Sequence, residues 1–335
     1  MEQGKKVIFS GIQPTGKITI GNYLGSLKNW IGMQEEFDCI FCVVDMHSIT
    51  VTQVPSELRK NTFDLLALYM ACGLSPEKSI LFVQSHVPAH AELTWVLNTI
   101  AYVGEMNRMT QFKDKSRKHA DNINMGLMDY PVLMASDILL YQADLVPVGV
   151  DQKQHVELAR NLAQRFNSRY SPTFVVPDCY IPPVAAKITS LQDPTAKMSK
   201  SDPNENAVVT MFDDKDAITR KFKRAVTDSD TEIRFDREKK PGVSNLLSIY
   251  CGFTGFTEKA AEEEFAGKGY GELKARVAES VIAALEPIQR EQKRLAADKA
   301  YLEAVLKTGA EKAERIANRT LEKVYRKVGF IPRAR

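Results

Sequence analysis

Two lysines and two serines lie together in the five-residue segment Lys197–Ser201, which stands between turn-forming residues. Lysine carries a compact charge on a long stem, so lysines three residues apart are able to follow a phosphate group that moves during a reaction. On its own, such a segment is more often a solvated basic turn than a binding site. Its interpretation as a polyphosphate site therefore depends on a second segment.

That second segment is the glycine-rich Ser10–Asn22, which follows a predicted strand and precedes a helix expected to start near Asn22. Glycines let a ligand approach the backbone closely, and the first turn of a helix offers free N–H groups to an anion. The segment also fits the first seven positions of a phosphate-binding P-loop, Gly11-x4-Gly16-Lys17. The eighth position is Ile18 instead of the serine or threonine that holds magnesium, and Pro14 removes one N–H donor. A P-loop ATPase is therefore a disfavoured alternative.

A third feature is Asp137, which lies in the otherwise apolar run 132–140. The helix that Pro131 is expected to open places four side chains on one face, Tyr130, Met134, Asp137 and Tyr141. A buried carboxylate needs a hydrogen-bond donor, and an indole N–H is a donor only, so Asp137 suits a tryptophan substrate. Phenylalanine would leave Asp137 unpaired, whereas tyrosine would not. The alternative is a core aspartate that is paired within the protein.

The histidines give no metal site. His47 is a lone histidine after a predicted strand, a position that is more often structural than catalytic. His86 and His90 have the spacing of helical metal ligands, but Pro88 lies between them and no third ligand is near. We therefore assign no protein-bound metal.

Thr19-Ile20-Gly21-Asn22 and Lys197-Met198-Ser199-Lys200-Ser201 resemble the two signature motifs of class I aminoacyl-tRNA synthetases. The first looks like the variant common in tryptophanyl-tRNA synthetases, and the second matches the usual form of the class. Five further blocks are similar to the bacterial tryptophanyl enzymes: 9–16, 45–50, 109–115, 130–137 and 149–155. The resemblance covers essentially the whole chain, and the combination is specific although each block alone is only suggestive.

The resemblance implies that the chain activates L-tryptophan with magnesium–ATP, forms tryptophanyl-adenylate and pyrophosphate, and transfers the amino acid to tRNA(Trp). It also implies a homodimer. The positions carried over for ATP are Gln13, Pro14, Thr15, Gly21, Asn22, Gly149, Val150, Asp151, Ile188, Lys197, Met198, Ser199, Lys200 and Ser201. Relatives usually carry glutamate in place of Val150, so only a backbone contact is expected there.

The chemistry of activation fits these residue types. The substrate carboxylate is already ionised at neutral pH, so its attack on the α-phosphate needs positioning and charge neutralisation rather than a general base. The candidate catalytic residues are Gln13, Lys115, Lys197 and Lys200. The predicted tryptophan site adds Phe9, Met134 and Val148 around the ring and Tyr130 and Gln152 near the amino group, with Asp137 on the indole N–H.

The elements that must position these residues alternate between strand-like and helix-like patterns in the first half of the chain. Strand-like runs are 7–10, 39–45, 80–85, 145–148 and 187–191, and helix-like runs include 56–72, with Ser56 as N-cap, and 151–170. This alternation predicts an α/β fold, a Rossmann-like parallel sheet covered by helices, with ligands beyond the carboxyl ends of the strands.

After Asn204 the pattern becomes helical, with predicted helices at 215–226, 242–250, 258–265, 272–295 and 310–328, the fourth kinked or broken at Pro287. We expect a Rossmann-like catalytic domain over 1–200, with a helical insertion around 86–130, and a helical domain over 201–335. By resemblance, the second domain binds the tRNA anticodon, and the last helix packs back on the catalytic domain.

Composition places the chain among globular proteins, with 335 residues, 44% hydrophobic and 26% charged. A net charge of +3 is too small for indiscriminate nucleic-acid binding, and no apolar run approaches the length of a membrane span. The five cysteines are scattered, and Cys39 and Cys42 should point to opposite faces of one strand, so we expect buried thiols in the cytoplasm. Tyrosyl-type specificity and a non-catalytic tRNA-binding paralogue stay as further alternatives.

Overall fold

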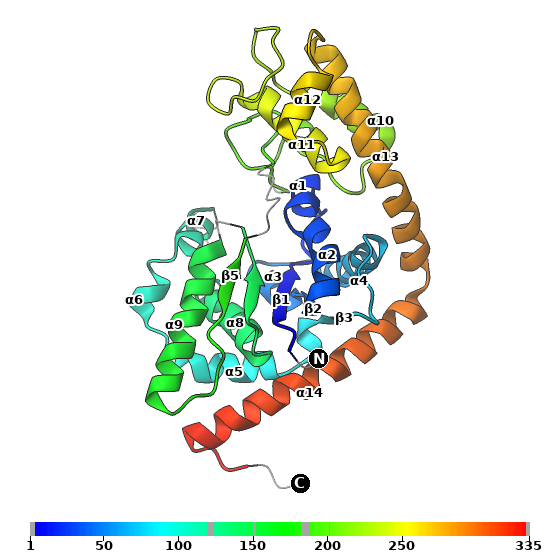
Figure 1. The fold of residues 1–335 in the computed structure, drawn as a ribbon. Coiled ribbons are helices and arrows are strands. Elements are labelled where there is room, and N and C mark those ends of the chain that lie inside the picture. The colour runs from blue at the N-terminus through cyan, green and yellow to red at the C-terminus, as the bar shows by residue number, and fades with distance from the viewer. Residues whose placement is uncertain (1–3, 119–122, 150–151, 182–187, 201, 333–335) are drawn as a thin grey trace. The chain divides into compact units, whose positions relative to one another are not determined.

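The computed structural model describes residues 4–118, 123–149, 152–181, 188–200 and 202–332 (Figure 1). Within them, five parallel strands form a sheet in the order β3-β2-β1-β4-β5. The strands are β1 (Val7–Ile12), β2 (Asp38–Val43), β3 (Ser79–Val83), β4 (Leu145–Pro147) and β5 (Asp178–Tyr180). With helices around this sheet, the predicted Rossmann-like α/β fold is confirmed.

The strand order reverses between β1 and β4. From β1 the chain goes to β2 and β3 on one side of the sheet, and then to β4 and β5 on the other. β1 pairs with β2 along its whole length, whereas its register with β4 is Ile8 opposite Leu145. The carboxyl ends of β1 and β4 therefore flank the topological switch point, which is the usual ligand position in an open α/β sheet.

The chain divides into two compact units. Unit 1 comprises Met1–Thr15, Gly32–Ile181 and Leu295–Arg335, and unit 2 comprises Gly16–Ile31 and Pro182–Arg294. These are structural groupings, and the functional domains 1–200 and 201–335 stay a prediction.

Unit 1 holds the sheet and most of the helices of the first half. Its helices are α3 (Asp45–Ser48), α4 (Pro55–Ala71), α5 (Ala89–Asn98), α6 (Val103–Met106), α7 (Thr110–Lys118), α8 (Met125–Leu140), α9 (Lys153–Arg169) and α14 (Lys299–Val328). α8 packs against α5, α9 and β1, and α4 packs against β2. Cys39 and Cys42 are both buried in β2, as expected.

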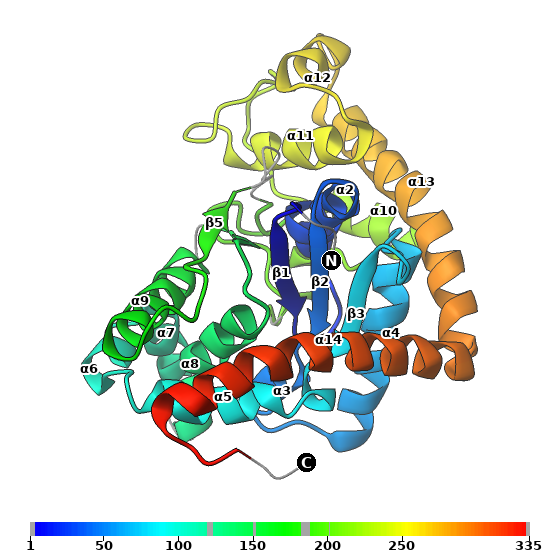
Figure 2. The same cartoon turned by 60° about the horizontal axis from the view of Figure 1, so that its bottom comes forward.

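The long helix α14 packs against β3 and also contacts α5, α8 and α4 (Figure 2). Its residues Ala313, Ala317, Leu321 and Val324 belong to the same apolar core as the central strands. Gly309 allows the close approach, because a Cβ at this position would overlap the backbone carbonyl of Leu81 in β3. The last helix therefore completes the core of unit 1.

Unit 2 is helical. It contains α1 (Ile20–Asn22), a π-helical turn (Tyr23–Leu27), α10 (Lys215–Lys223), α11 (Pro241–Thr254), α12 (Glu258–Glu264) and most of α13 (Tyr270–Ala297), and α2 (Lys28–Glu36) leads back into unit 1. The helix expected near Asn22 thus begins two residues earlier, and α13 continues through Pro287 without a break.

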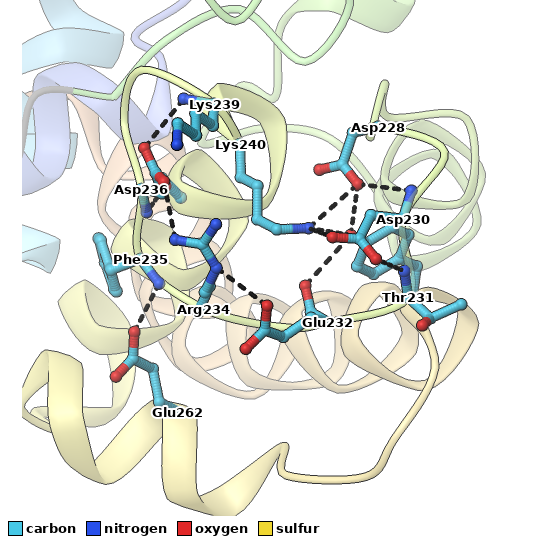
Figure 3. Close-up of polar contacts among 12 residues, drawn as sticks. Asp228, Asp230, Thr231, Glu232, Arg234, Phe235, Asp236, Lys239, Lys240 and Glu262 are labelled. Carbon is cyan, nitrogen blue, oxygen red and sulfur yellow. Dashed lines mark hydrogen bonds and ion pairs between the residues drawn. The ribbon is translucent and has the colours of Figure 1, made fainter.

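A cluster around Lys240 holds the loop before α11 in unit 2 (Figure 3). The Lys240 ammonium lies 2.8 Å from Asp230, 3.1 Å from the Tyr270 hydroxyl and 3.3 Å from Asp228, and its side chain is 3% exposed. Burial alone would lower the pKa of Lys240, but these hydrogen bonds outweigh burial and raise it above the usual value. The cluster therefore ties the loop to the start of α13.

Three local predictions are corrected by the structure. The fifth strand is Asp178–Tyr180 and not the run 187–191. The described residues of that run, from Ile188 on, turn back on themselves, and Thr189 pairs with Lys197 in an isolated antiparallel bridge. Ser56 is not an N-cap, since Pro55 already occupies the first turn of α4. Pro131 does not open a helix either. It lies inside α8, which Asn124 caps seven residues earlier.

No helix in the described ranges is both long enough and apolar enough to cross a membrane.

Candidate active site

Asp137 is the centre of a buried hydrogen-bond network in unit 1. It lies on α8 and is 1% exposed. Its Oδ2 accepts from His47 Nε2 at 2.8 Å, and its Oδ1 accepts from Gln84 Nε2 at 2.7 Å and from His90 Nδ1 at 2.6 Å. These donors come from α3, from the turn after β3 and from α5. Three elements thus converge on one carboxylate.

The network keeps Asp137 ionised. Burial by itself would raise the pKa of this carboxyl, but the hydrogen bonds from His47 and His90 outweigh burial and hold the pKa below its usual value. An ionised carboxylate only accepts, and it offers about four lone-pair positions. The described side chains fill three of them, two on Oδ1 and one on Oδ2. Oδ2 therefore retains the capacity to accept one more donor.

The other residues predicted for tryptophan lie on the elements that meet at the switch point. Phe9 is in β1, Tyr130 and Met134 are on α8 with Asp137, Val148 directly follows β4, and Gln152 is the N-cap of α9. Phe9 is buried, and Met134 and Val148 pack against the same core. The Tyr130 hydroxyl lies 2.9 Å from His155 Nε2 on α9. Apolar and polar candidates thus come from adjacent elements of unit 1.

Of the two motif segments, Thr19–Asn22 forms a reciprocal helix cap in unit 2. Asn22 N–H donates to Thr19 Oγ1, and Thr19 N–H donates to Asn22 Oδ1, each at 3.1 Å. The neighbouring backbone is anchored as well, since Ile20 N–H donates to Val209 O and Met211 N–H to Ile18 O. Ile18 is therefore buried and paired, and the helix begins after Thr19. This geometry differs from a P-loop, in which the helix starts directly at the lysine.

The lysine-containing segment follows a hairpin that starts at Ile188. Met198 N–H donates to Ile188 O at 3.2 Å, and Asn245 on α11 bonds both backbone groups of Thr189. Met198 is buried, and Lys197 and Lys200 are exposed. The hairpin thus presents both lysines on a fixed base.

The two motif segments lie next to each other within unit 2. A Cβ built on Gly21 would lie 3.5 Å from Ile188 Cβ, and one built on Gly16 would lie 3.7 Å from Lys200 Cδ. Segments about 180 residues apart in the sequence therefore meet. The interpretation of these segments as a polyphosphate site requires this proximity.

The structure gives less information on the other positions predicted to bind ATP. Gln13, Pro14 and Thr15 follow β1, and Gly149 follows β4 and accepts from Gln152 N–H at 2.9 Å. Val150, Asp151 and Ser201 lie outside the described residues, as does the side chain of Lys115, although its backbone is in α7. Gly11, expected to admit a ligand, has a packing role: a Cβ there would lie 2.7 Å from Val44 Cγ1.

The sequence analysis did not connect Gln84 or His90 with Asp137, and it interpreted a lone histidine such as His47 as more often structural than catalytic. The available signal was a glutamine directly after the apolar strand β3 and a histidine in the apolar run that became α5. Both are fully buried, and both bond Asp137. The core-aspartate interpretation was thus correct in that protein side chains pair this carboxylate.

Among the described residues, no group of three or more His, Cys, Asp or Glu side chains could hold a metal ion.

A five-stranded parallel sheet, two adjoining motif segments and a buried aspartate are features expected of a nucleotide-using α/β enzyme. A family model described as "tRNA synthetases class I (W and Y)" matches residues 1–286. The chain belongs to this family.

Individual proteins that are similar to this chain are tryptophan enzymes of the family. A Tryptophan--tRNA ligase from Clostridium tetani is 56% identical over 331 residues, covering 99% of this chain and 98% of the relative, and one from Clostridium perfringens is 53% identical. A tryptophanyl-tRNA synthetase structure from Mycoplasma pneumoniae has a TM-score of 0.92 at 37% identity, covering 98% of both chains. One from Campylobacter jejuni, solved with ADP and tryptophan, has a TM-score of 0.82 at 32% identity, covering 97% of this chain and all of that one.

Proposed function

We propose that this chain is a tryptophan--tRNA ligase: it activates L-tryptophan with ATP and transfers it to tRNA(Trp). Relatives of that name match it over nearly its whole length, and the family uses ATP as co-substrate. The observation that carries the choice of amino acid is the buried, ionised Asp137, which has capacity for one further donor.

The indole N–H of tryptophan is that donor, and it bonds Oδ2 of Asp137. Phe9, Met134 and Val148 contact the ring, and Tyr130 and Gln152 lie toward the amino group. A phenylalanine side chain is rejected because it leaves this buried acceptor unpaired. The rejection of tyrosine follows from the fit of the larger bicyclic ring rather than from Asp137.

In the activation step, a carboxylate oxygen of tryptophan forms a bond to the α-phosphorus of ATP. The bond from that phosphorus to the bridging oxygen breaks, and its electron pair leaves with pyrophosphate. No proton has to move, so the protein contributes position and charge. Gln13 lies near the transferring phosphate, and Lys115, Lys197 and Lys200 neutralise the leaving group. Magnesium enters with ATP as part of the substrate.

The remaining ATP contacts follow the motif positions. Pro14, Thr15, Gly21 and Asn22 border the nucleotide from the glycine-rich segment, and Gly149, Val150 and Asp151 meet the ribose. Ile188, Met198, Ser199 and Ser201 complete the adenine and phosphate side. The proximity of Gly16 to Lys200 and of Gly21 to Ile188 supports this arrangement.

The helical second domain binds the tRNA anticodon, and the protein acts as a homodimer in the cytoplasm. A surface of unit 1 with exposed apolar side chains is compatible with a dimer contact: Ile49 is 65% exposed and Trp95 is 70% exposed, and both line a hollow of about 480 Å³. Light scattering should give twice the chain mass for the wild type and a smaller mass for Trp95→Glu. Phe256→Glu, on an exposed apolar residue of unit 2, is the control.

ATP–pyrophosphate exchange with each of the twenty amino acids tests the proposal. We expect exchange that depends on tryptophan and is largely lost in Lys200→Ala, and no loss in Lys259→Ala, a strongly exposed lysine of α12. Exchange with tyrosine would overturn the specificity. ATP hydrolysis without any amino acid would favour the P-loop alternative, and the absence of both reactions would favour a non-catalytic paralogue.

A further inference from the structure

Tyr141 lies directly after α8 and is completely buried. Among the described residues, its hydroxyl bonds neither Asp137 nor the motif segments. Its hydroxyl lies 2.8 Å from His90 Nε2. Its ring stacks on Phe9, with centroids 5.4 Å apart and an interplanar angle of 5°. Burial raises the pKa of Tyr141 well above its usual value, so the hydroxyl keeps its hydrogen.

The contact with Asp137 fixes which nitrogen of His90 carries hydrogen. Asp137 is ionised and only accepts, so His90 Nδ1, 2.6 Å from Oδ1, must donate. A neutral imidazole with hydrogen on Nδ1 has a bare Nε2, and the Tyr141 hydroxyl donates to it. In the opposite tautomer, the lone pair of Nδ1 would face the carboxylate. The hydrogen on Nε2 and the hydroxyl hydrogen of Tyr141 would then both lie in the short contact between these two groups.

The orientation of the Gln84 side-chain amide is fixed in the same way. Met46 N–H donates to Gln84 Oε1 at 3.1 Å, so the amide nitrogen of Gln84 must point to Asp137 Oδ1. Both donors to Oδ1 are thus locked by groups behind them. Oδ1 is filled, and the remaining capacity of the carboxylate is on Oδ2.

We propose that Tyr141 is a positioning residue for the amino-acid substrate: its hydroxyl holds His90 in the tautomer that fills Oδ1 of Asp137, which leaves Oδ2 to read the indole N–H. This inference rests on the proposed function. Through its stack on Phe9, the same side chain also links the acceptor to the apolar wall of the site. Tyr141 therefore acts on specificity without touching the substrate.

The test is Tyr141→Phe, which keeps the ring and removes only the hydroxyl. The readout is the ratio of kcat/KM for tryptophan to that for 3-benzothienylalanine, in which sulfur replaces the indole N–H. We expect this ratio to fall about tenfold, with a higher KM for tryptophan and an unchanged KM for ATP. A purely structural role would lower both values of kcat/KM together and leave the ratio unchanged, and that result would overturn the proposal.

The matched control is Tyr69→Phe. Tyr69 is also fully buried in unit 1, and its hydroxyl bonds backbone groups of Ile12 and Cys42 rather than the Asp137 network. We expect it to lower thermal stability without changing the ratio. A fall in the ratio as large as that of Tyr141→Phe would contradict the assigned route.

A double-mutant cycle checks that the effect passes through His90. His90→Asn keeps a donor near the Nδ1 position and removes Nε2. Adding Tyr141→Phe to His90→Asn should then leave the ratio unchanged, and a full further tenfold fall would exclude His90 as the intermediary.

One measurement needs no variant. The imidazole ¹⁵N chemical shifts of His90 in the wild type should show hydrogen on Nδ1 and a bare Nε2, and the opposite tautomer would overturn the inference. Failure of the proposed function looks different: the wild type itself would then lack tryptophan-dependent exchange or would not prefer tryptophan over its sulfur analogue.

Discussion

Replacing Asp137 by asparagine should remove most of the capacity to recognise the indole N–H. An amide has one oxygen and one nitrogen that donates. In the less costly orientation, the amide oxygen keeps Gln84 and His90, and the nitrogen faces His47 and the substrate. The contact with His47 and the contact with the indole N–H then each become a contact between two donors. The lost bond to the indole is worth about 1.5–3 kcal/mol, which corresponds to a fall in kcat/KM for tryptophan of about 10- to 150-fold.

Tryptophan-dependent ATP–pyrophosphate exchange measures this change, with 3-benzothienylalanine as the comparison substrate. The sulfur analogue cannot donate, so its kcat/KM should change much less than that of tryptophan. Asp129→Asn is the control, because Asp129 lies on the same helix, is half-buried and bonds Asn98 instead of the network. An Asp137→Asn enzyme with a normal KM for tryptophan would refute the assignment of the acceptor.

Three further outcomes follow from the structure. Gly309→Ala should destabilise unit 1 by about 1–3 kcal/mol, because its Cβ meets the carbonyl of Leu81. Gly32→Ala, at an open position of α2, should instead stabilise by about 0.5–1 kcal/mol, and urea midpoints compare the two. The pKa of Asp137 is lowered by folding, so its charge stabilises the protein above the unfolded pKa, and this contribution is lost as the pH falls. The stability gap between wild type and Asp137→Asn should therefore shrink below about pH 4. Lys240→Met should lower the melting temperature and increase proteolysis of the loop at 228–240. The reason is that Asp228 and Asp230 would face each other without the cation that lies between them. Unchanged proteolysis would show that the cluster does not hold the loop.

The central sheet was predictable because its strands are apolar and alternate with helices. Four of the five strands were located from sequence within two residues of each end. β5 was missed, since Asp-Cys-Tyr is short and half exposed and gives no apolar run. The run 187–191 has the composition of a strand, but Thr189 within it pairs with Lys197 of the next hairpin arm, and composition does not specify the partner.

A residue of the candidate site could be predicted where its residue type has only one plausible role at that position. Asp137 was located because a carboxylate in an apolar run needs a donor. Its actual partners Gln84 and His90 could not be derived, because they come from separate elements whose packing only the tertiary structure determines. Periodicity did place Tyr141 near Asp137, but it could not reveal that a histidine stands between their polar groups.

The position of α14 has a consequence for protein synthesis. The helix that covers β3 is synthesised long after the strand itself, so the sheet made from the first half of the chain waits for α14 before its core closes. A premature stop codon before α14 would therefore not yield a shortened but working enzyme. It would release nascent chains with an uncovered apolar sheet, which are substrates for chaperones and proteases.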